Sequence, residues 1–199
     1  MKITRLSRAV VSGTAAVVLP ITLGVMAPSA FAETTAGGGT STGPFGPACA
    51  SVPETGPGSL ASMAKEPVAT AASNNPDLST LTAAVKKAGL VDTLNNSKNI
   101  TVFAPSNEAF AKIPKADLDK LLADKAQLTK VLTYHVVGQK ITQSQLANGS
   151  FKTLEGASLT TAGSGQNFTV NNTSKIVCGG VPTANATVNI IDTVLTPPN

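Results

Sequence analysis

The order of helical and strand-forming segments along this chain of 199 residues limits most strongly the folds open to it. Short runs rich in β-branched residues, separated by Gly, Asn and Ser, fill the second half and predict strands. They are SFKTL (150–154), ASLTTA (157–162), NFTVN (167–171), KIVCG (175–179) and TVNIIDTVL (187–195). One earlier strand is expected at NITVFAP (99–105), between helical segments. Helices followed by strands favour an α+β fold over a regular alternation of strand and helix.

Helix signals cluster in the first half of the chain. Pro67 suits a first helical position before VATAAS, and Asp77 is expected to cap the segment 78–89. That segment ends in two lysines and Gly89, as a helix C-terminus prefers. Further along, apolar residues recur at spacings of three and four, which predicts two helices separated by a break near Asp124. These apolar residues are Leu118, Leu121, Leu122, Leu128, Val131 and Leu132.

The N-terminus has the pattern of a secretory signal peptide. Basic residues precede an apolar run from Ala9 to about Met26, and Ala30-Phe31-Ala32 supplies a small-x-small cleavage pattern. An uncleaved membrane anchor is the alternative, which Pro20 and the cleavage pattern disfavour. We therefore expect residues 1–32 to be removed and the protein to be secreted, either free or associated with the cell surface.

Removal of the signal peptide changes the charge of the chain. Lys2, Arg5 and Arg8 are three of its 15 basic residues, so twelve lysines would face 11 acidic residues in the remainder. A nearly neutral surface without arginine lacks the side chain that grips phosphate groups through two parallel hydrogen bonds. Nucleic acid is therefore not expected as a partner. No second apolar run of membrane-spanning length follows, so we expect no membrane span in the mature chain.

The segment after the signal peptide differs in composition from the rest. Residues 33–58 are rich in Gly, Pro, Thr and Ser, and such a segment buries too little apolar area to offset chain entropy. We expect a flexible leader over 33–58 and a folded domain over 59–199. Cys49 and Cys178 are the only cysteines. An even count in an exported chain predicts one disulfide, which would tether the leader; two free thiols are the alternative.

The sequence offers little for catalysis or for metal binding. A hydrolase triad would need His135, the only histidine, as its base, and no Gly-x-Ser-x-Gly motif supplies a nucleophile. One histidine and two cysteines expected in a disulfide cannot assemble a zinc site. We therefore expect no enzyme, no metal site and no bound cofactor. An open cleft joining Asp92, Asp192 and His135 would revive acid–base catalysis.

Three stretches in order carry a resemblance to a known family. They are ITVFAPSNEAF (100–110), LTYHVV (132–137) and NIIDTVLTPP (189–198). In order and spacing they resemble the two signature segments and the tyrosine–histidine motif of a fasciclin domain. EPVATAASNNP (66–76) and CGGVPTANATV (178–188) further resemble the single-domain mycobacterial secreted immunogenic proteins.

The resemblance implies both a fold and a class of function. Fasciclin domains pack a helical layer on a β-wedge of short strands, and as a family they serve adhesion and extracellular interaction rather than catalysis. The implied partner is an extracellular or cell-surface protein or polysaccharide, and we expect a monomer. Some animal members of the family bind integrins through an Asp-Ile pair just before the final strand, and the corresponding stretch here, Gly179–Ala186, has no acidic residue. The mature chain also has no arginine for an Arg-Gly-Asp motif, so direct integrin binding is not expected.

The pair Tyr134-His135 is the first candidate interaction site. LTYHVV is expected to lead from a helix into a strand, where neighbouring side chains point to opposite faces. We therefore expect His135 to be structural, hydrogen-bonded and partly buried, with an edge of Tyr134 at the surface as a binding handle. The loop residues Pro182, Thr183 and Asn185 are the other binding candidates.

A carrier of a small apolar or haem-like ligand is the competing function. It would need an exposed His135 as axial ligand and a pocket of roughly several hundred cubic ångströms between helices and strands. A coloured or ligand-bearing preparation of the protein would be its experimental signature.

Overall fold

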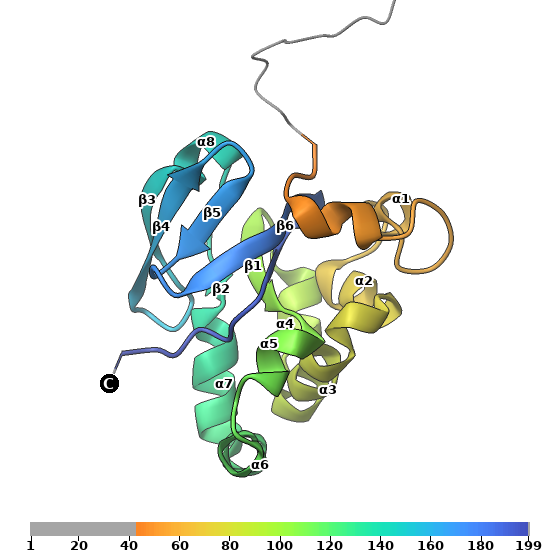
Figure 1. The fold of residues 1–199 in the computed structure, drawn as a ribbon. Coiled ribbons are helices and arrows are strands. Elements are labelled where there is room, and N and C mark those ends of the chain that lie inside the picture. The colour runs from red at the N-terminus through yellow and green to blue at the C-terminus, as the bar shows by residue number, and fades with distance from the viewer. Residues whose placement is uncertain (1–42, 199) are drawn as a thin grey trace, which may run out of the picture. The chain divides into compact units, whose positions relative to one another are not determined.

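The computed structural model describes residues 43–198, and most of its helices precede its strands. The predicted signal peptide and residues 33–42 of the predicted leader lie outside the described residues. The helices and 3-10 turns (Figure 1) are η1 (Pro47–Ser51), α1 (Leu60–Met63), α2 (Val68–Asn74), η2 (Pro76–Leu78), α3 (Ser79–Ala88), α4 (Val91–Asn96), α5 (Asn107–Ala111), α6 (Lys115–Ala123), α7 (Lys125–Tyr134) and α8 (Gln143–Leu146). Between residues 43 and 198, no helix combines the length and the apolar character needed to cross a bilayer.

The strands form one mixed sheet of seven strands within the described residues. They are β1 (Ile100–Pro105), β2 (Val136–Val137), β3 (Asn148–Lys152), β4 (Ser158–Ser164), β5 (Asn167–Val170), β6 (Ser174–Pro182) and β7 (Ala186–Ile191). Their order is β2-β1-β7-β6-β5-β4-β3, with β1 and β7 parallel and all other neighbours antiparallel. A bridge between Val137 and Thr153 brings the two outer edges together, so the sheet resembles a barrel. This arrangement confirms the predicted α+β fold class.

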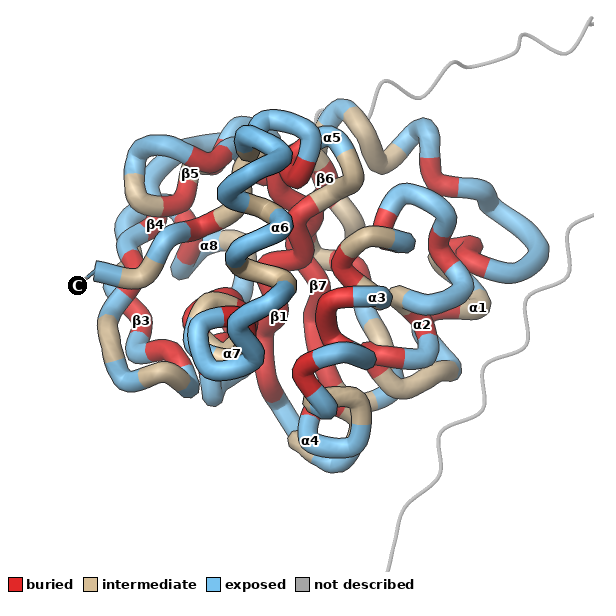
Figure 2. The backbone as a smooth tube through the Cα atoms, turned by 90° about the horizontal axis from the view of Figure 1, so that it is seen from below, coloured by how far each residue is buried: buried red, intermediate tan, exposed pale blue. Residues whose placement is uncertain are grey.

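The parallel strands β1 and β7, here called the central strands because they lie between the helices and the other strands, are buried on both faces. Every residue of β1 and of β7 is buried. Val102 and Ala104 pack with the helices, whereas Phe103 between them packs among the strands. In Figure 2, β1 and β7 run as red segments between α7 and α3. Because side chains alternate between the two faces of a strand, these strands divide the interior into two apolar cores.

The two cores correspond to the expected helical layer and β-wedge. In Figure 1 the helices α1, α2 and α3 lie on one side of the central strands, and β3, β4 and β5 lie with α8 on the other. The first core, between helices and central strands, includes Met63, Leu78, Leu81, Val85, Leu128 and Val188. The second core, enclosed by the strands, includes Phe45, Phe103, Tyr134, Leu146, Phe151, Leu159 and Phe168.

Two helix boundaries follow from residues next to them in sequence, the end of α3 at Gly89 and the start of α7 at Asp124. Gly89 ends α3 in the left-handed conformation with a φ of 75°, which fits the predicted helix end. Asp124 separates α6 from α7, as the break in the leucine pattern predicted. Its carboxylate accepts hydrogen bonds from the backbone N–H groups of Ala126 and Gln127 at 2.9 and 3.1 Å, and so caps α7.

The start of α3 differs from the prediction. Asp77 does not cap this helix but lies within η2. Asn107 of α5 caps it instead, because its Oδ1 accepts from the N–H of Thr80 at 3.0 Å. The Nδ2 of Asn107 also donates to the carbonyl of Pro76 at 2.9 Å. This cap comes from a different helix, so no rule based on neighbouring residues could reveal it.

The prediction of a flexible leader does not hold for residues 43–52, which are held against the sheet by Phe45, Cys49 and Val52. Phe45 pairs with Gly179 of β6 through two backbone hydrogen bonds of 2.9 and 2.7 Å. Phe45 and Val52 are each only 5% exposed. The polar composition of this segment predicted flexibility, but burial of Phe45 and Val52 holds it in place. The backbone hydrogen bonds that Gly179 of β6 makes with Phe45 add to this. The folded part therefore begins before residue 59.

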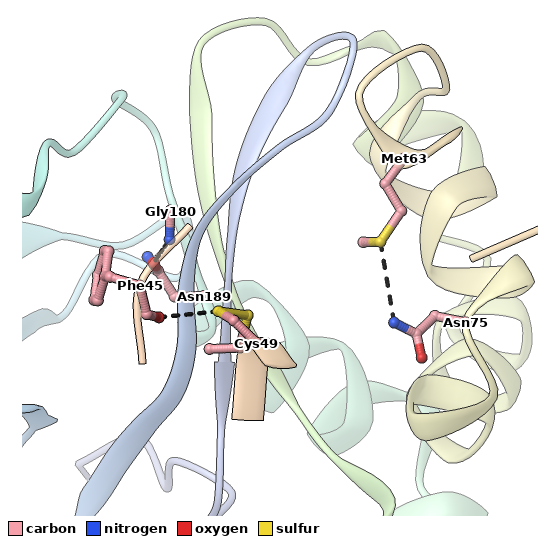
Figure 3. The surroundings of a disulfide bond; sticks show 7 residues. Phe45, Cys49, Met63, Asn75, Gly180 and Asn189 are labelled. Carbon is pink, nitrogen blue, oxygen red and sulfur yellow. Dashed lines mark hydrogen bonds between the residues drawn. A yellow bond between two sulfur atoms is a disulfide. The ribbon is translucent and has the colours of Figure 1, made fainter. Parts of the chain in front are cut away.

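The disulfide joins Cys49 of η1 to Cys178 of β6, which confirms the predicted pairing. The two Cα atoms lie 4.8 Å apart, and the cysteines are separated by 129 positions in sequence. Figure 3 shows the bond close to Phe45. Gly179 leaves room for the Phe45 ring, because a Cβ on Gly179 would lie 2.4 Å from a ring carbon. The covalent bond and the buried ring together hold the N-terminal part of the described chain on β6.

Candidate functional site

Tyr134 and His135 lie where α7 ends and β2 begins, and both are buried. Tyr134 is the last residue of α7, and His135 follows it in a helical conformation rather than in a strand. Each is 2% exposed, so the expectation that an edge of Tyr134 reaches the surface is wrong. The Tyr134 hydroxyl accepts from Nδ2 of Asn171 at 2.9 Å and donates to the carbonyl of Ser158 at 3.3 Å. Tyr134 therefore joins α7 to the strands.

Both ring nitrogens of His135 have backbone partners. Nδ1 lies 2.7 Å from the carbonyl oxygen of Val131, one helical turn earlier. Nε2 accepts a hydrogen bond from the N–H of Leu195 at 2.9 Å. The backbone carbonyl of His135 also accepts from the N–H of Phe103 in β1 at 2.8 Å. His135 therefore joins α7, β1 and the segment after β7.

This environment keeps the His135 ring neutral. Burial lowers the pKa of His135 from 6.5 to about 4, and the hydrogen bond to Val131 offsets only part of that effect. The form with its proton on Nδ1 donates to Val131 and accepts from Leu195, which a doubly protonated ring cannot do. His135 is therefore hydrogen-bonded through both ring nitrogens, and it is fully rather than partly buried.

The geometry does not support the carrier function. A haem ligand would need a free ring nitrogen on His135, and both nitrogens are engaged. The cavity beside His135 measures about 40 Å³, and its walls are almost entirely apolar side chains of α2, α3, α4 and β1. Ligand pockets are roughly 300–1,000 Å³, so this cavity is a packing gap of the first core.

The carboxylates considered for acid–base chemistry do not meet His135. Asp192 accepts from the N–H of Lys175 at 2.8 Å and pairs with Nζ of Lys112 at 3.1 Å. Partial burial acts to raise the pKa of Asp192, but these hydrogen bonds and the charge of Lys112 lower it. Neither Asp92 nor Asp192 lines the cavity beside His135. Across residues 43–198, no three His, Cys, Asp or Glu side chains gather to hold a metal ion.

Asn185, one of the loop candidates, holds the helical layer together. Its Nδ2 donates to the carbonyls of Leu94 and Ser97 at 2.7 and 2.6 Å. Its Oδ1 accepts from the N–H of Val68 at 2.9 Å, at the start of α2. The side chain therefore ties the β6–β7 loop to the end of α4 and the start of α2. The sequence predicted Asn185 as a surface binding residue because its hydrogen-bond partners lie about 90 or more positions away and cannot be recognised from neighbouring residues.

The other two loop candidates differ in exposure. The hydroxyl of Thr183 donates to the carbonyl of Ala186 and accepts from its N–H, both at 3.0 Å, which closes the loop. Thr183 is half-buried, whereas Pro182 is exposed. Of the predicted binding candidates Tyr134, His135, Pro182, Thr183 and Asn185, Pro182 alone is exposed.

A groove that the sequence does not predict opens beside Pro182. It has a volume of about 620 Å³ and lies between the segment around α8, the β4–β5 turn and the ends of β6 and β7. Its floor consists of the buried residues Phe45, Ile141, Leu146 and Phe168. Its exposed rim includes Lys140, Thr142, Ser144, Ala147, Ser164 and Pro182. We call it the Pro182 groove.

Asn189 of β7 also lines the Pro182 groove. It is 1% exposed, and its Oδ1 accepts from the N–H of Gly180 at 2.9 Å. Its Nδ2 has no hydrogen-bond partner among the described residues. Figure 3 shows this amide next to Phe45 and Gly180. In the sequence, Asn189 is notable only as a polar residue within the β-branched run TVNII (187–191).

Comparison with known proteins agrees with the sequence motifs. The family model of the fasciclin domain matches residues 76–197. Cell surface glycolipoprotein MPB83 of Mycobacterium bovis is 54% identical over 149 residues, which cover 72% of this chain and 66% of that protein. Immunogenic protein MPB70 of the same species is 48% identical over 161 residues, covering 77% of this chain and 82% of that protein. The chain thus spans just under two thirds of the glycolipoprotein.

A solved structure resembles the fold as well. It is the FAS1 domain pair of the insect cell adhesion molecule fasciclin I, with a TM-score of 0.54. The match covers 66% of this chain and 51% of that one, at 18% sequence identity. At this identity the likeness shows a shared fold and nothing further.

Proposed function

The chain belongs to the fasciclin domain family, and we propose that it is a secreted, non-catalytic interaction module that mediates adhesion. Its partner is an extracellular or cell-surface protein or polysaccharide, and it acts as a monomer. The signal-peptide pattern of residues 1–32 supports secretion. The names of its relatives, a cell surface glycolipoprotein and an immunogenic protein, support the same location and denote no enzyme.

The observation that carries this proposal is the Pro182 groove. Tyr134 and His135 are too deeply buried to touch a partner, so the contact surface lies elsewhere. The groove has a volume of about 620 Å³, which falls within the range of ligand sites, roughly 300–1,000 Å³. It also contains Pro182, the one predicted candidate that is exposed. Tyr134 and His135 then serve the interaction only by holding α7, the strands and the segment after β7 in place.

Blocking the groove tests this function. Ala147 is exposed on the groove rim, and Ala126 is exposed on α7 and does not line the groove. Ala147→Trp and Ala126→Trp therefore make the same chemical change inside and outside the proposed site. Beads coated with each protein would be applied to immobilised mycobacterial cell envelopes and to animal extracellular matrix, and retained beads counted under flow.

We expect wild type and Ala126→Trp to be retained on at least one surface, and Ala147→Trp to lose most of that retention. Circular dichroism and thermal unfolding of all three proteins would establish that each is folded. Equal retention of folded Ala147→Trp would remove the groove from the proposed function. Failure of wild type to be retained on either surface would contradict adhesion itself.

A further inference from the structure

Residues 194–198, which follow the bend after β7, belong to no helix or strand. In Figure 1 they form the dark blue end of the chain near the C mark. We call these residues the strap. Leu195 is 3% exposed, whereas the other residues of the strap are half-buried or exposed. The strap is therefore seated on the fold by a single buried side chain.

One hydrogen bond holds the strap. The N–H of Leu195 donates to Nε2 of His135 at 2.9 Å. Within residues 43–198, no other hydrogen bond involves the strap. Pro197 and Pro198 carry no N–H and therefore cannot donate one. Among the described residues, His135 is thus the only polar anchor of the strap.

The chain is fixed independently just before the strap begins. The carboxylate of Asp192 accepts from the N–H of Lys175 at 2.8 Å, and the hydroxyl of Thr193 accepts from Nζ of Lys112 at 3.2 Å. Neither bond involves the histidine, so both persist when the histidine loses its bond to the strap. A hinge therefore lies directly after Thr193.

The bond between His135 and the strap exists in only one protonation state. Nε2 accepts from Leu195 while the ring is neutral, and a proton on Nε2 turns it into a donor that faces another donor. The charge would also lie in apolar surroundings, which is costly. We propose that the strap is an acid-sensitive device: protonation of His135 releases residues 194–198 while the helices and the sheet stay folded.

Release of the strap brings water to the ring. Val131 and Leu195, whose backbone groups pair with the two ring nitrogens, both line a groove of about 540 Å³ between α6, α7 and the strap. When the strap leaves, the ring opens to the solvent in this groove. The pKa of His135 then returns from about 4 to its ordinary 6.5. Acid therefore favours the released state.

No other group near His135 has an ordinary pKa between 5 and 7. The chain has one histidine, and the other residues that line the small cavity beside it are uncharged. The charged groups of the elements around the ring are carboxylates and ammonium groups, which titrate well below and well above this window. They form the pairs Lys130–Glu155, Lys120–Asp117 and Lys112–Asp192.

The two pKa values set the size of the effect. The released state takes up a proton below pH 6.5, and the closed state does so only near pH 4. The equilibrium constant for release should therefore rise about twentyfold between pH 7 and pH 5. This differs from a general loss of stability, because only the N–H groups of the strap become exposed.

Hydrogen exchange followed by NMR on 15N-labelled mature protein separates release from global unfolding. Exchange would be measured at pH 7 and pH 5 and corrected for the intrinsic rate at each pH. The N–H of Phe103 is the matched control, because it donates to the carbonyl of the same His135 at 2.8 Å but belongs to β1.

We expect the Leu195 N–H to be at least about a hundredfold less protected than the Phe103 N–H, because a local opening costs less than global unfolding. Its protection should fall about twentyfold from pH 7 to pH 5. Low concentrations of urea should leave its exchange unchanged, because release of the strap exposes little surface.

His135→Gln tests the role of the ring. The glutamine amide can accept from Leu195 and donate to Val131 without titrating, so the protection of Leu195 should be the same at both pH values. Equal protection of Leu195 and Phe103 in wild type would overturn the proposal, because the strap would then open only with the whole protein. A pH dependence that is absent in wild type, or equal in the variant, would also overturn it. If the variant does not fold, the comparison of the two wild-type N–H groups decides alone.

Discussion

The Nε2 atom of His135 accepts a hydrogen bond from the backbone N–H of Leu195 at 2.9 Å, across 60 positions of sequence. This contact joins the end of α7 to the segment that follows the last strand. Leu195 itself is buried in the second core. The Tyr134-His135 motif, which the sequence presented as the first candidate binding site, is therefore buried. The hydrogen bonds of His135 contribute to the stability of the fold.

The stability of the protein should fall as the pH drops from about 6.5 to about 4. The pKa of His135 is 6.5 in an unfolded chain and about 4 in the folded protein. In that window the unfolded chain binds a proton that the folded protein does not, so the free energy of unfolding rises with pH. The contribution is complete above pH 6.5 and lost by about pH 4, and amounts to about 3 kcal/mol.

Urea unfolding of wild type and His135→Gln at pH 7 and pH 4.5 would measure this effect. The glutamine amide can donate to Val131 and accept from Leu195 without titrating, so the variant should lose much less stability on acidification. Asp192 does not interfere, because its lowered pKa adds stability that disappears only below about its ordinary value of 3.8. Equal losses in the two proteins would show that His135 does not carry the pH dependence.

Reduction of the disulfide should lower the thermal midpoint of unfolding. Cys49 and Cys178 close a loop with a sequence separation of 129. The chain-entropy model gives such a bridge at most about 5 kcal/mol, so we expect a drop of about 10 °C. Calorimetry with and without reductant, beside a Cys49→Ala/Cys178→Ala double variant, would measure it. The double variant should have the same thermal midpoint as reduced wild type, and reductant should not change it. An unchanged midpoint of wild type on reduction would show that the disulfide does not stabilise the fold.

Gly179→Ala should release the segment that precedes η1 from the sheet. The added Cβ would lie 2.4 Å from a carbon of the Phe45 ring, which cannot stay in place. We expect a loss of about 1–3 kcal/mol, together with faster proteolysis between Phe45 and Val52. Gly43→Ala is the matched control, because a Cβ there meets nothing within 4 Å. Similar cleavage of both variants would argue against the packing role of Gly179.

Asn185→Ala should destabilise the protein without altering ligand binding by the folded fraction. The substitution removes hydrogen bonds to Val68, Leu94 and Ser97, including a helix cap, at a cost of about 2–3 kcal/mol. Asn148→Ala, at an exposed asparagine of β3, should change stability by less than about 0.5 kcal/mol. Chemical denaturation would compare the two. A folded, fully stable Asn185→Ala that fails to adhere would instead make Asn185 a contact residue.

Features that depend on neighbouring residues were predictable. Asp124 interrupts the leucine pattern and can bond the next free N–H groups, so the boundary between α6 and α7 follows from a few adjacent positions. Gly89 permits a left-handed turn that other residues resist, which marks the end of α3. The even count of cysteines in an exported chain predicted the Cys49–Cys178 bond for a chemical reason independent of the fold.

Features that depend on residues far apart in the sequence could not be predicted from it. The packing of Phe45 needed Gly179, and the cap of α3 needed Asn107 from a later helix. The Pro182 groove is formed by the N-terminal segment, the α8 region, the β4–β5 hairpin, β6 and β7, so no short stretch of sequence contains its pattern. Such partners are chosen by the three-dimensional packing of the sheet and not by local propensity.

By itself the sequence determined the α+β class, the family, two helix boundaries and the disulfide, because hydrophobic periodicity, caps and cysteine chemistry act over short stretches or through residue type. Only the tertiary structure decided that Tyr134 and His135 are buried, that Asn185 is a structural tie and that Nδ2 of Asn189 remains unpaired beside a groove. The physical reason is that burial and hydrogen-bond pairing belong to an arrangement of several segments, and a residue's type specifies only which bonds it can make.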